Sequence, residues 1–399
     1  MDKGLISDVH NDQAKNQFGK NEWSGAVGDL GTMLPLAFGL VLFNEFPLAR
    51  LLLFWGIIYL ITGWYFKVPI SVQPLKAMSV LAIAQGFSAD FLSTTAVFFG
   101  ILLIILVASG LIEKLERIFT PGVTIGIQVG IGFILAQKAI LLVIEKGWLL
   151  HNESGDNLIV RFLVFALAIT LLGLFRTVIK FPLVPVLVLV SVLVVLYLNS
   201  ETVAPIDQPL VFLSFPSFEY FTQAVIVLII PQLPLTLGNA IYSASNASKT
   251  LWKVQAEKVT PEKLATSIGV GNVFIGLMGG FPMCHGAGGM AAHHQFGGRT
   301  GGTTIILGSC LIILALIPAS SMFVFLIPVP LLAGLLVFNS WQMVNFAFGV
   351  SDKIVLAVVL VTAVTSFVTR NLAVALLVGK LLELTLEKTI RIVKQAKEE

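Results

Sequence analysis

Charged side chains and cysteine are scarce in this chain of 399 residues. Only 12% of the residues are charged and 56% are hydrophobic, and the mean hydropathy is +0.93. A soluble domain carries about 25% charged residues, so this composition excludes a soluble fold and indicates a polytopic membrane protein. The two cysteines, Cys284 and Cys310, lie in apolar stretches and do not indicate a disulfide framework.

The first twenty residues also lack the apolar run of a cleaved signal peptide. We therefore expect residues 1–22 to form a polar cytoplasmic tail. Apolar spans of about 20 residues divide the remainder into a first seven-segment repeat at 23–199, a connector at 200–218, a second seven-segment repeat at 219–388 and a cytoplasmic tail at 389–399. The predicted fold is an all-α polytopic membrane protein with fourteen transmembrane segments in 7+7 inverted repeats.

The proposed segments follow from the apolar runs. The first seven lie at roughly 23–43, 48–66, 69–87, 91–112, 118–146, 158–178 and 182–199. The second seven lie at roughly 219–243, 264–279, 282–297, 301–320, 323–346, 352–369 and 371–388. This placement puts most of the 25 lysines and arginines on the side of the two termini. The positive-inside rule then makes both termini cytoplasmic, in the plasma (inner) membrane if the source is prokaryotic.

Two of these segments are interrupted, at Pro69–Gly86 and at Phe281–Gly297. Pro74 is expected at the start of a short helix after an extended piece, and Gly286–Gly289 opens a second short helix after another. A helix that starts in mid-membrane presents free N–H groups and its positive dipole end there, which suits an anion. Interrupted segments in matching halves indicate a transporter's substrate site. We therefore predict half-helices in segments 3 and 10 of an anion transporter.

Three polar residues lie in the first half of this predicted site. Asp29 lies within the first span, where a carboxylate usually marks an ion or proton path, unless it is near enough to the surface to be solvated. Lys76 is in the first turn of its half-helix, where the dipole disfavours a cation. An anion or Asp29 would neutralise it, and the alternative is a lysine that reaches the surface. Gln73 is placed to donate to a ligand or to cap the helix.

Segment 8 contributes Gln232 and Asn239, beside the helix-breaking Pro231 and Pro234. Their side chains either repair the interrupted backbone or line the site, and both roles are compatible.

In segment 10, His285 precedes the second half-helix and Gly286, Ala287 and Gly288 follow it. Their backbone N–H groups could contact a ligand, while the small residues equally permit close helix packing.

Four ordered motifs resemble the signature stretches of the molybdate transporter family, a branch of the sulfate permease superfamily. They are GDLGTMLP at Gly28–Pro35, TGWYFKVPISVQPLKA at Thr62–Ala77, PQLPLTLGNAIYSAS at Pro231–Ser245 and FPMCHGAGGMAAHHQFGGRTGG at Phe281–Gly302. The resemblance implies the seven-plus-seven inverted repeat of uracil permease-like transporters. A core of segments 1–4 and 8–11 would move against a gate of segments 5–7 and 12–14, and two copies would dimerise through the gate. Sulfate permeases generally end in a STAS domain, for which this chain is too short.

The predicted function is secondary active transport of a tetrahedral oxyanion by elevator-type alternating access, with molybdate as the expected substrate and Asp29 as the proton-coupling candidate. Sulfate and tungstate are alternatives because they have the same shape and charge. The candidate substrate-binding residues are Asp29, Thr32, Gln73, Lys76, Gln232, Asn239, His285, Gly286, Ala287 and Gly288.

Two further readings are less favoured. A nucleobase permease of the same fold typically uses buried carboxylates on segments 8 and 10, and the central stretches here have none. A membrane enzyme would need a nucleophile with its base or a metal cluster, and His285, His293 and His294 are the residues that could contribute to one. We expect His293 and His294 to lie at a solvated inner end. No enzymatic activity, metal site, cofactor or nucleic-acid partner is expected; membrane lipid and a second copy are the expected neighbours.

Overall fold

The computed structural model describes most of the chain, namely residues 15–149, 157–174, 183–198, 210, 213–317 and 322–398. This part is mainly helical, with a single two-stranded sheet among the described residues. Residues 1–14 of the predicted tail and most of the predicted connector 200–218 lie outside it.

The elements of the first half are α1 (Lys20–Ala26), α2 (Leu30–Asn44), α3 (Leu48–Phe66), β1 (Gln73–Pro74), α4 (Lys76–Gln85), α5 (Ala89–Ala108), α6 (Ile112–Ile118), α7 (Pro121–Glu145), α8 (Leu158–Leu174) and α9 (Leu183–Leu198). Those of the second half are η2 (Phe218–Tyr220), α10 (Phe221–Gln223), η3 (Ala224–Ile229), α11 (Ile230–Leu235), η4 (Thr236–Ser243), α12 (Ala244–Trp252), η5 (Lys253–Ala256), α13 (Pro261–Leu277), β2 (Met283–Cys284), α14 (Ala287–Gln295), α15 (Gly302–Leu316), α16 (Met322–Phe325), α17 (Val329–Val344), η7 (Asn345–Gly349), α18 (Lys353–Thr369) and α19 (Leu372–Glu398).

Several helices of the described chain are long and apolar enough to cross a membrane. These six are Lys20–Asn44, Leu48–Phe66, Ala89–Ala108, Pro121–Glu145, Phe218–Ala256 and Val329–Gly349. Four shorter apolar helices are Leu158–Leu174, Leu183–Tyr197, Gly302–Leu316 and Lys353–Thr369. The protein is therefore an integral, multi-pass membrane protein, whereas the count of fourteen segments stays a prediction.

The helix α1 begins earlier than the sequence suggests, at Lys20, within the expected tail. Glu22 is only 2% exposed. Its carboxylate accepts hydrogen bonds from the backbone N–H groups of Arg299 and Thr300 and from the hydroxyl of Thr303. Because these donors stand at the entrance to α15, Glu22 fixes the start of the chain to the second half of the protein.

The short extended pieces predicted before the two half-helices are present, and they pair with each other. The strands β1 and β2 are antiparallel, with Pro74 opposite Met283. Pro74 therefore lies in a strand and does not start the helix, which begins at Lys76. The physical reason is that the N–H of Leu75 donates to the carbonyl of Pro282, 3.2 Å away, and so extends the strand pairing by one residue.

The chain from 218 to 256 is one continuous helical run that passes through both Pro231 and Pro234. Proline has no N–H to donate, so its turn of helix leaves carbonyl groups without their usual partners. Here π-helical turns, η3 and η4, lie on either side of the proline-containing α11. Such local adjustments let a transmembrane helix tolerate proline. The break predicted at Pro231 and Pro234 is therefore a change of helical pitch within a continuous helical run.

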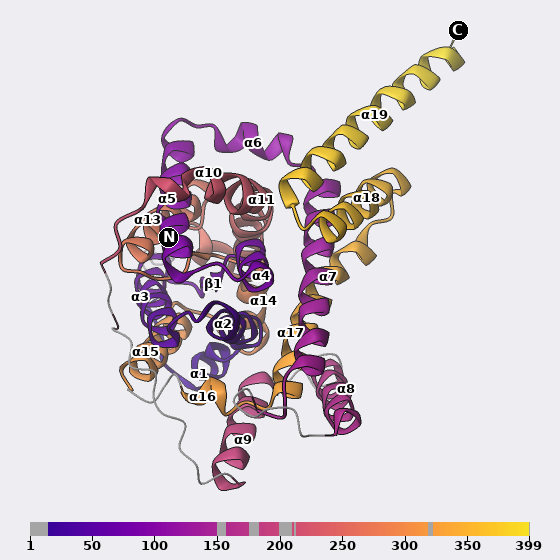
Figure 1. The fold of residues 1–399 in the computed structure, drawn as a ribbon. Helices are drawn as coiled ribbons and strands as arrows, with labels where there is room; N and C mark the ends of the chain where they lie inside the picture. Colours follow the sequence, from indigo (N-terminus) through magenta and orange to yellow (C-terminus); the bar gives the residue numbers. More distant parts are fainter. Residues whose placement is uncertain are drawn as a thin grey trace, which may run out of the picture.

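The helices pack in two groups (Figure 1). In one group α3 lies along α15 and α5 along α13; in the other, α7 packs against α17 and α18. Glycines make the first pairings close. A Cβ on Gly56 would lie 2.8 Å from the carbonyl oxygen of Gly308, and one on Gly100 would lie 2.6 Å from that of Gly269. The first group contains both half-helices, so this close packing supports the site.

Candidate functional site: a cavity at two half-helix N-termini

A cavity of about 690 Å³ lies against the starts of both half-helices. Five of the predicted site residues line it: Thr32, Gln73, Lys76, Asn239 and Gly288. Its opposite wall comes from α8, α9, α17 and η7. This wall includes the apolar Leu172, Val184 and Phe338 and the polar Gln342 and Asn345. Among the described residues that line the cavity, Lys76 is the only charged one. The cavity therefore has a cationic, polar floor and an uncharged, mainly apolar opposite wall.

The N-terminus of α4 is already occupied by a side chain. Gln232 is 2% exposed, and its Oε1 accepts hydrogen bonds from the backbone N–H groups of Ala77 at 2.9 Å and Met78 at 3.2 Å. Its Nε2 donates to the hydroxyl of Thr236 at 3.1 Å. Gln232 does not line the cavity; it caps the half-helix, which is the backbone-repair role that the sequence left open.

The N-terminus of α14 is open by comparison. Gly286 is its N-cap and provides no side-chain cap, and its carbonyl accepts the N–H of Gly289 at 3.1 Å. No acceptor for the N–H groups of Ala287 and Gly288 is found among the described residues. A Cβ on Gly288 would meet no atom within 4 Å. This end of α14 therefore offers two backbone donors and open space.

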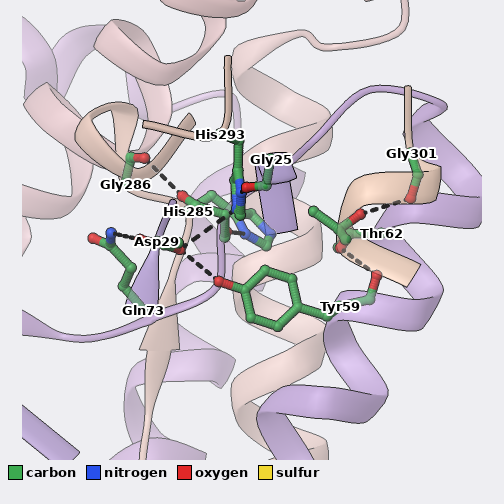
Figure 2. A network of polar contacts seen from close by, with 11 residues as sticks. Gly25, Asp29, Tyr59, Thr62, Gln73, His285, Gly286, His293 and Gly301 are labelled. Atoms are coloured by element: carbon green, nitrogen blue, oxygen red, sulfur yellow. Dashed lines mark hydrogen bonds and ion pairs between the residues drawn. The ribbon is translucent and has the colours of Figure 1, made fainter. Parts of the chain in front are cut away.

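Asp29 stands behind the cavity floor, fully buried at the break between α1 and α2. Its carboxylate accepts hydrogen bonds from the Tyr59 hydroxyl at 2.5 Å and from Nε2 of Gln73, as Figure 2 shows. His293 lies on its other side, with 3.8 Å between Nε2 and the carboxylate. The burial removes the alternative of a solvated Asp29 near the surface.

The expectation for His293 is wrong. We expected it at a solvated end of α14, whereas it is fully buried and packed edge-on against the ring of Tyr59. Its neighbour His294 is half-buried and does not line the cavity. Four of the five residues before His293 are small, namely Gly288, Gly289, Ala291 and Ala292, which is compatible with burial of the histidine. Nothing in the sequence indicates its contact with Asp29.

His285 does not line the cavity either. It is fully buried, with Nδ1 2.8 Å from the carbonyl oxygen of Ser71 and Nε2 2.9 Å from the hydroxyl of Ser267. Both ring nitrogens are therefore engaged by protein groups. His285 therefore connects the extended piece before α4 to α13, which is a structural role.

Glycines at the start of α14 let the half-helix approach the polar cluster. A Cβ on Gly286 would lie 2.4 Å from Oε1 of Gln73. A Cβ on Gly289 would lie 2.5 Å from Oδ1 of Asp29, 2.5 Å from Nε2 of Gln73 and 2.6 Å from Cβ of Ser71. Of the three predicted positions 286–288, Gly286 is thus needed for packing, whereas Gly288 faces the cavity.

Comparison with known proteins agrees with this fold. A family described as "Molybdate transporter of MFS superfamily" matches residues 21–135 and 224–343. Molybdate transporter 1 of Arabidopsis thaliana is 27% identical over 373 residues, which cover 83% of this chain and 80% of the relative. Molybdate transporter 1 of Chlamydomonas reinhardtii is 25% identical and covers 90% of both chains.

Two solved structures share the fold. The transmembrane domain of the cyanobacterial bicarbonate transporter BicA has a TM-score of 0.66 at 18% identity and covers 91% of this chain and 97% of that domain. The murine anion transporter Slc26a9 in its inward-facing state has a TM-score of 0.69 at 12% identity, covering 96% of this chain and 70% of its own.

The fold and the cavity define the class as a multi-pass membrane transporter for anions, and the homologues are transporters and not enzymes. The family profile covers more than half of the chain, in both of its halves. The chain belongs to the molybdate transporter family, as the four motifs predicted.

Proposed function

We propose that this protein is a secondary active transporter of a tetrahedral oxyanion, with molybdate as the first substrate. The observation that carries the proposal is the cavity whose only charged lining residue among those described is Lys76 and whose floor includes the open N-terminus of α14. Named relatives in two organisms are molybdate transporters, which favours molybdate over other oxyanions of the same shape. Sulfate and tungstate are the competing substrates to test.

The oxyanion is held by several weak contributions that converge. Gly288, Lys76, Thr32 and Asn239 line the open space. Ala287 does not line it, but its N–H is the donor next to that of Gly288 at the start of α14. A partly buried helix end contributes up to about 2 kcal/mol, and a hydrogen bond to a charged group about 1.5–3 kcal/mol. Removing a dianion from water is costly, so no single group suffices.

The two half-helices contribute differently. We expected free N–H groups from both, but those of Ala77 and Met78 in α4 are bonded to Gln232. In this proposal α14 donates hydrogen bonds to the anion, while α4 supplies its positive dipole end and Lys76. Gln232 neutralises no charge, because it is an amide, so the cap keeps the field of α4 favourable to an anion.

The packing supports an inverted repeat and an elevator-type movement. In an inverted repeat α3 corresponds to α13 and α5 to α15, so the contact of α3 with α15 corresponds to that of α13 with α5. In the same way α2 corresponds to α12 and α4 to α14, so the contact of α2 with α4 corresponds to that of α12 with α14. All four pairs of helices are in contact. The cavity floor belongs to the predicted core and its opposite wall to the predicted gate. A shift of the core along this wall would break the hydrogen bond from Asn339 to the carbonyl of Thr32 and would expose the site to each side of the membrane in turn.

Proton coupling through Asp29, cytoplasmic termini and a homodimer through the gate complete the proposal. Two observations support proton coupling through Asp29: its side chain is fully buried, and it accepts a hydrogen bond from Gln73, which lines the cavity. A protonated Asp29 would admit the anion, and an ionised Asp29 would discourage its return, since like charges in a low-dielectric interior repel strongly.

The test is uptake of labelled molybdate by the purified chain in proteoliposomes, with sulfate and tungstate as unlabelled competitors at several external pH values. We expect saturable uptake that molybdate and tungstate inhibit more strongly than sulfate. Preferential inhibition by sulfate would reassign the substrate to sulfate. Absence of uptake for all three anions by protein that is folded and inserted would overturn the proposed function.

A further inference from the structure

The first observation concerns the tautomer of His293. Its Nδ1 lies 2.9 Å from the carbonyl oxygen of Gly25, and a carbonyl oxygen can only accept a hydrogen bond. Nδ1 therefore carries a hydrogen. The other nitrogen, Nε2, then either carries the proton of an imidazolium ion or presents a lone pair.

The second observation is what Nε2 faces. It is buried, has no hydrogen-bond partner and lies 3.8 Å from the carboxylate oxygen Oδ2 of Asp29. A lone pair directed at a buried carboxylate would be repelled, whereas a proton at Nε2 makes an ion pair. The geometry therefore calls for a proton between Asp29 and His293.

The third observation concerns Gln73, which connects this pair to the cavity. Its Nε2 donates to Asp29, which requires an accepting carboxylate oxygen. Its Oε1 is buried without a donor and lies beside Gly286 at the start of α14. Figure 2 shows the amide with its nitrogen toward Asp29 and its oxygen away from it. A buried amide oxygen without a donor is unfavourable, and here it points to the end of the helix that would receive an anion.

We propose that Asp29 and His293 hold one exchangeable proton between them, and that Gln73 transmits its position to the anion site by rotating its amide. The inference rests on the proposed function, and it adds His293 and Gln73 to the coupling role that Asp29 alone had.

The step balances as a proton transfer. The N–H bond at Nε2 of His293 breaks and an O–H bond forms at the Asp29 carboxylate, so the imidazolium becomes neutral as the carboxylate does. The proton arrives at Oδ2, the oxygen that faces His293, and reaches Oδ1, the oxygen that faces Gln73, when the carboxyl group rotates. An O–H at Oδ1 needs an acceptor, and rotation of the Gln73 amide by about 180° supplies Oε1. The same rotation turns Nε2 of Gln73 toward Gly286, where it can donate to the anion. Loss of the proton to the other side reverses the rotation and releases the anion.

Other titratable groups surround the pair. Tyr59 on α3 donates its hydroxyl hydrogen to Asp29. Cys284 on β2 lies within electrostatic range of Asp29, Tyr59 and Lys76. Lys76 on α4 lines the cavity. A dianion bound beside Lys76 would repel a carboxylate at Asp29, and so favours transfer of the proton to Asp29.

The test measures protons taken up as molybdate binds to the purified full-length chain. Calorimetry in buffers of different ionisation enthalpy gives the number, and infrared difference spectroscopy detects the C=O band of a protonated carboxyl group. Because a carboxyl proton is needed for binding, we expect uptake toward one proton per anion at high pH, where the apparent Kd rises by up to about tenfold per pH unit. No proton uptake at high pH, in protein that still binds molybdate there, would overturn the inference but leave the proposed function standing. Absence of binding of molybdate, sulfate and tungstate would instead overturn the proposed function.

Variants assign the roles. In Asp29→Asn the side-chain amide can donate to Oε1 of Gln73 as a protonated Asp29 would, so binding should persist with no pH dependence and no carboxyl band. His293→Asn keeps a donor for Gly25 and removes Nε2, so the pH dependence should weaken. His294→Asn, on the same helix and outside the cavity, is the matched control and should keep the wild-type slope.

Gln73→Met keeps the side-chain length but has no amide to rotate, so it should bind molybdate more weakly and with a flattened slope. Equal slopes for His293→Asn and His294→Asn would remove His293 from the proton site. A wild-type slope in Gln73→Met would remove the amide rotation. Melting curves in detergent establish beforehand that each variant is folded, and the buffer measurement on the wild-type chain remains decisive if one is not.

Discussion

Two adjacent glycines in α14 should respond in opposite ways to the same substitution. A Cβ on Gly289 would lie within 2.6 Å of three atoms, those of Asp29, Gln73 and Ser71 named above, whereas a Cβ on Gly288 would meet nothing within 4 Å. We predict that Gly289→Ala destabilises the fold and that Gly288→Ala leaves the fold intact but weakens anion binding.

The magnitudes follow from packing and helix propensity. Alanine in place of a helical glycine gains roughly 0.5–1 kcal/mol, and overpacking a filled site costs typically about 1–3 kcal/mol. One of the atoms close to Gly289 is the Cβ of Ser71, which cannot rotate away, so we expect a net loss of about 2 kcal/mol there. Gly288→Ala should be as stable as wild type or slightly more so. Its new methyl group enters the cavity and obstructs a backbone donor.

The binding effect can be estimated in the same way. Loss of one hydrogen bond to a charged ligand costs about 1.5–3 kcal/mol, which is about tenfold or more in Kd. The assay pairs a melting curve in detergent with molybdate titration for both variants. Gly19→Ala is the control, because a Cβ there would meet nothing within 4 Å and Gly19 does not line the cavity. Wild-type melting of Gly289→Ala, or wild-type affinity of Gly288→Ala, would refute the geometry of this helix start.

Two further variants test buried contacts that hold the scaffold. Gln232→Leu leaves the N–H groups of Ala77 and Met78 without their acceptor, at a cost of about 1–3 kcal/mol for each unpaired buried donor, so the melting temperature in detergent should fall; unchanged melting would show that the cap is unimportant. Glu22→Ala removes the acceptor of the Thr300 N–H, and we expect lower stability with unchanged molybdate affinity, because Glu22 does not line the cavity. A change in affinity without a change in stability would contradict that assignment.

The sequence predicted the features that local chemistry determines. Proline and glycine near Pro74 and Gly286 break the apolar runs, so the two half-helices and their extended pieces could be located. Asp29 could be identified because a carboxylate in an apolar span is costly. The exact helix start could not, because it depends on a hydrogen bond from Leu75 to Pro282 in the other half of the chain.

The contacts that arrange the site are long-range and left no local pattern. Gln232 caps a half-helix 154 or more positions earlier in the chain, and His293 meets Asp29 across the two halves. A histidine after several small residues is equally compatible with an exposed helix end, so the sequence does not predict that His293 is buried. Only the fold brings these residues together.

We propose that an oxyanion binds at the open start of α14, beside Lys76. Tungstate has the shape and charge of molybdate, and its tungsten atom scatters strongly and anomalously, so a structure of the chain with bound tungstate locates the ion directly. We predict one tungsten peak in the cavity, with anion oxygens at hydrogen-bond distance from the N–H groups of Ala287 and Gly288. A peak elsewhere, with this cavity empty, would contradict binding of the oxyanion at the start of α14.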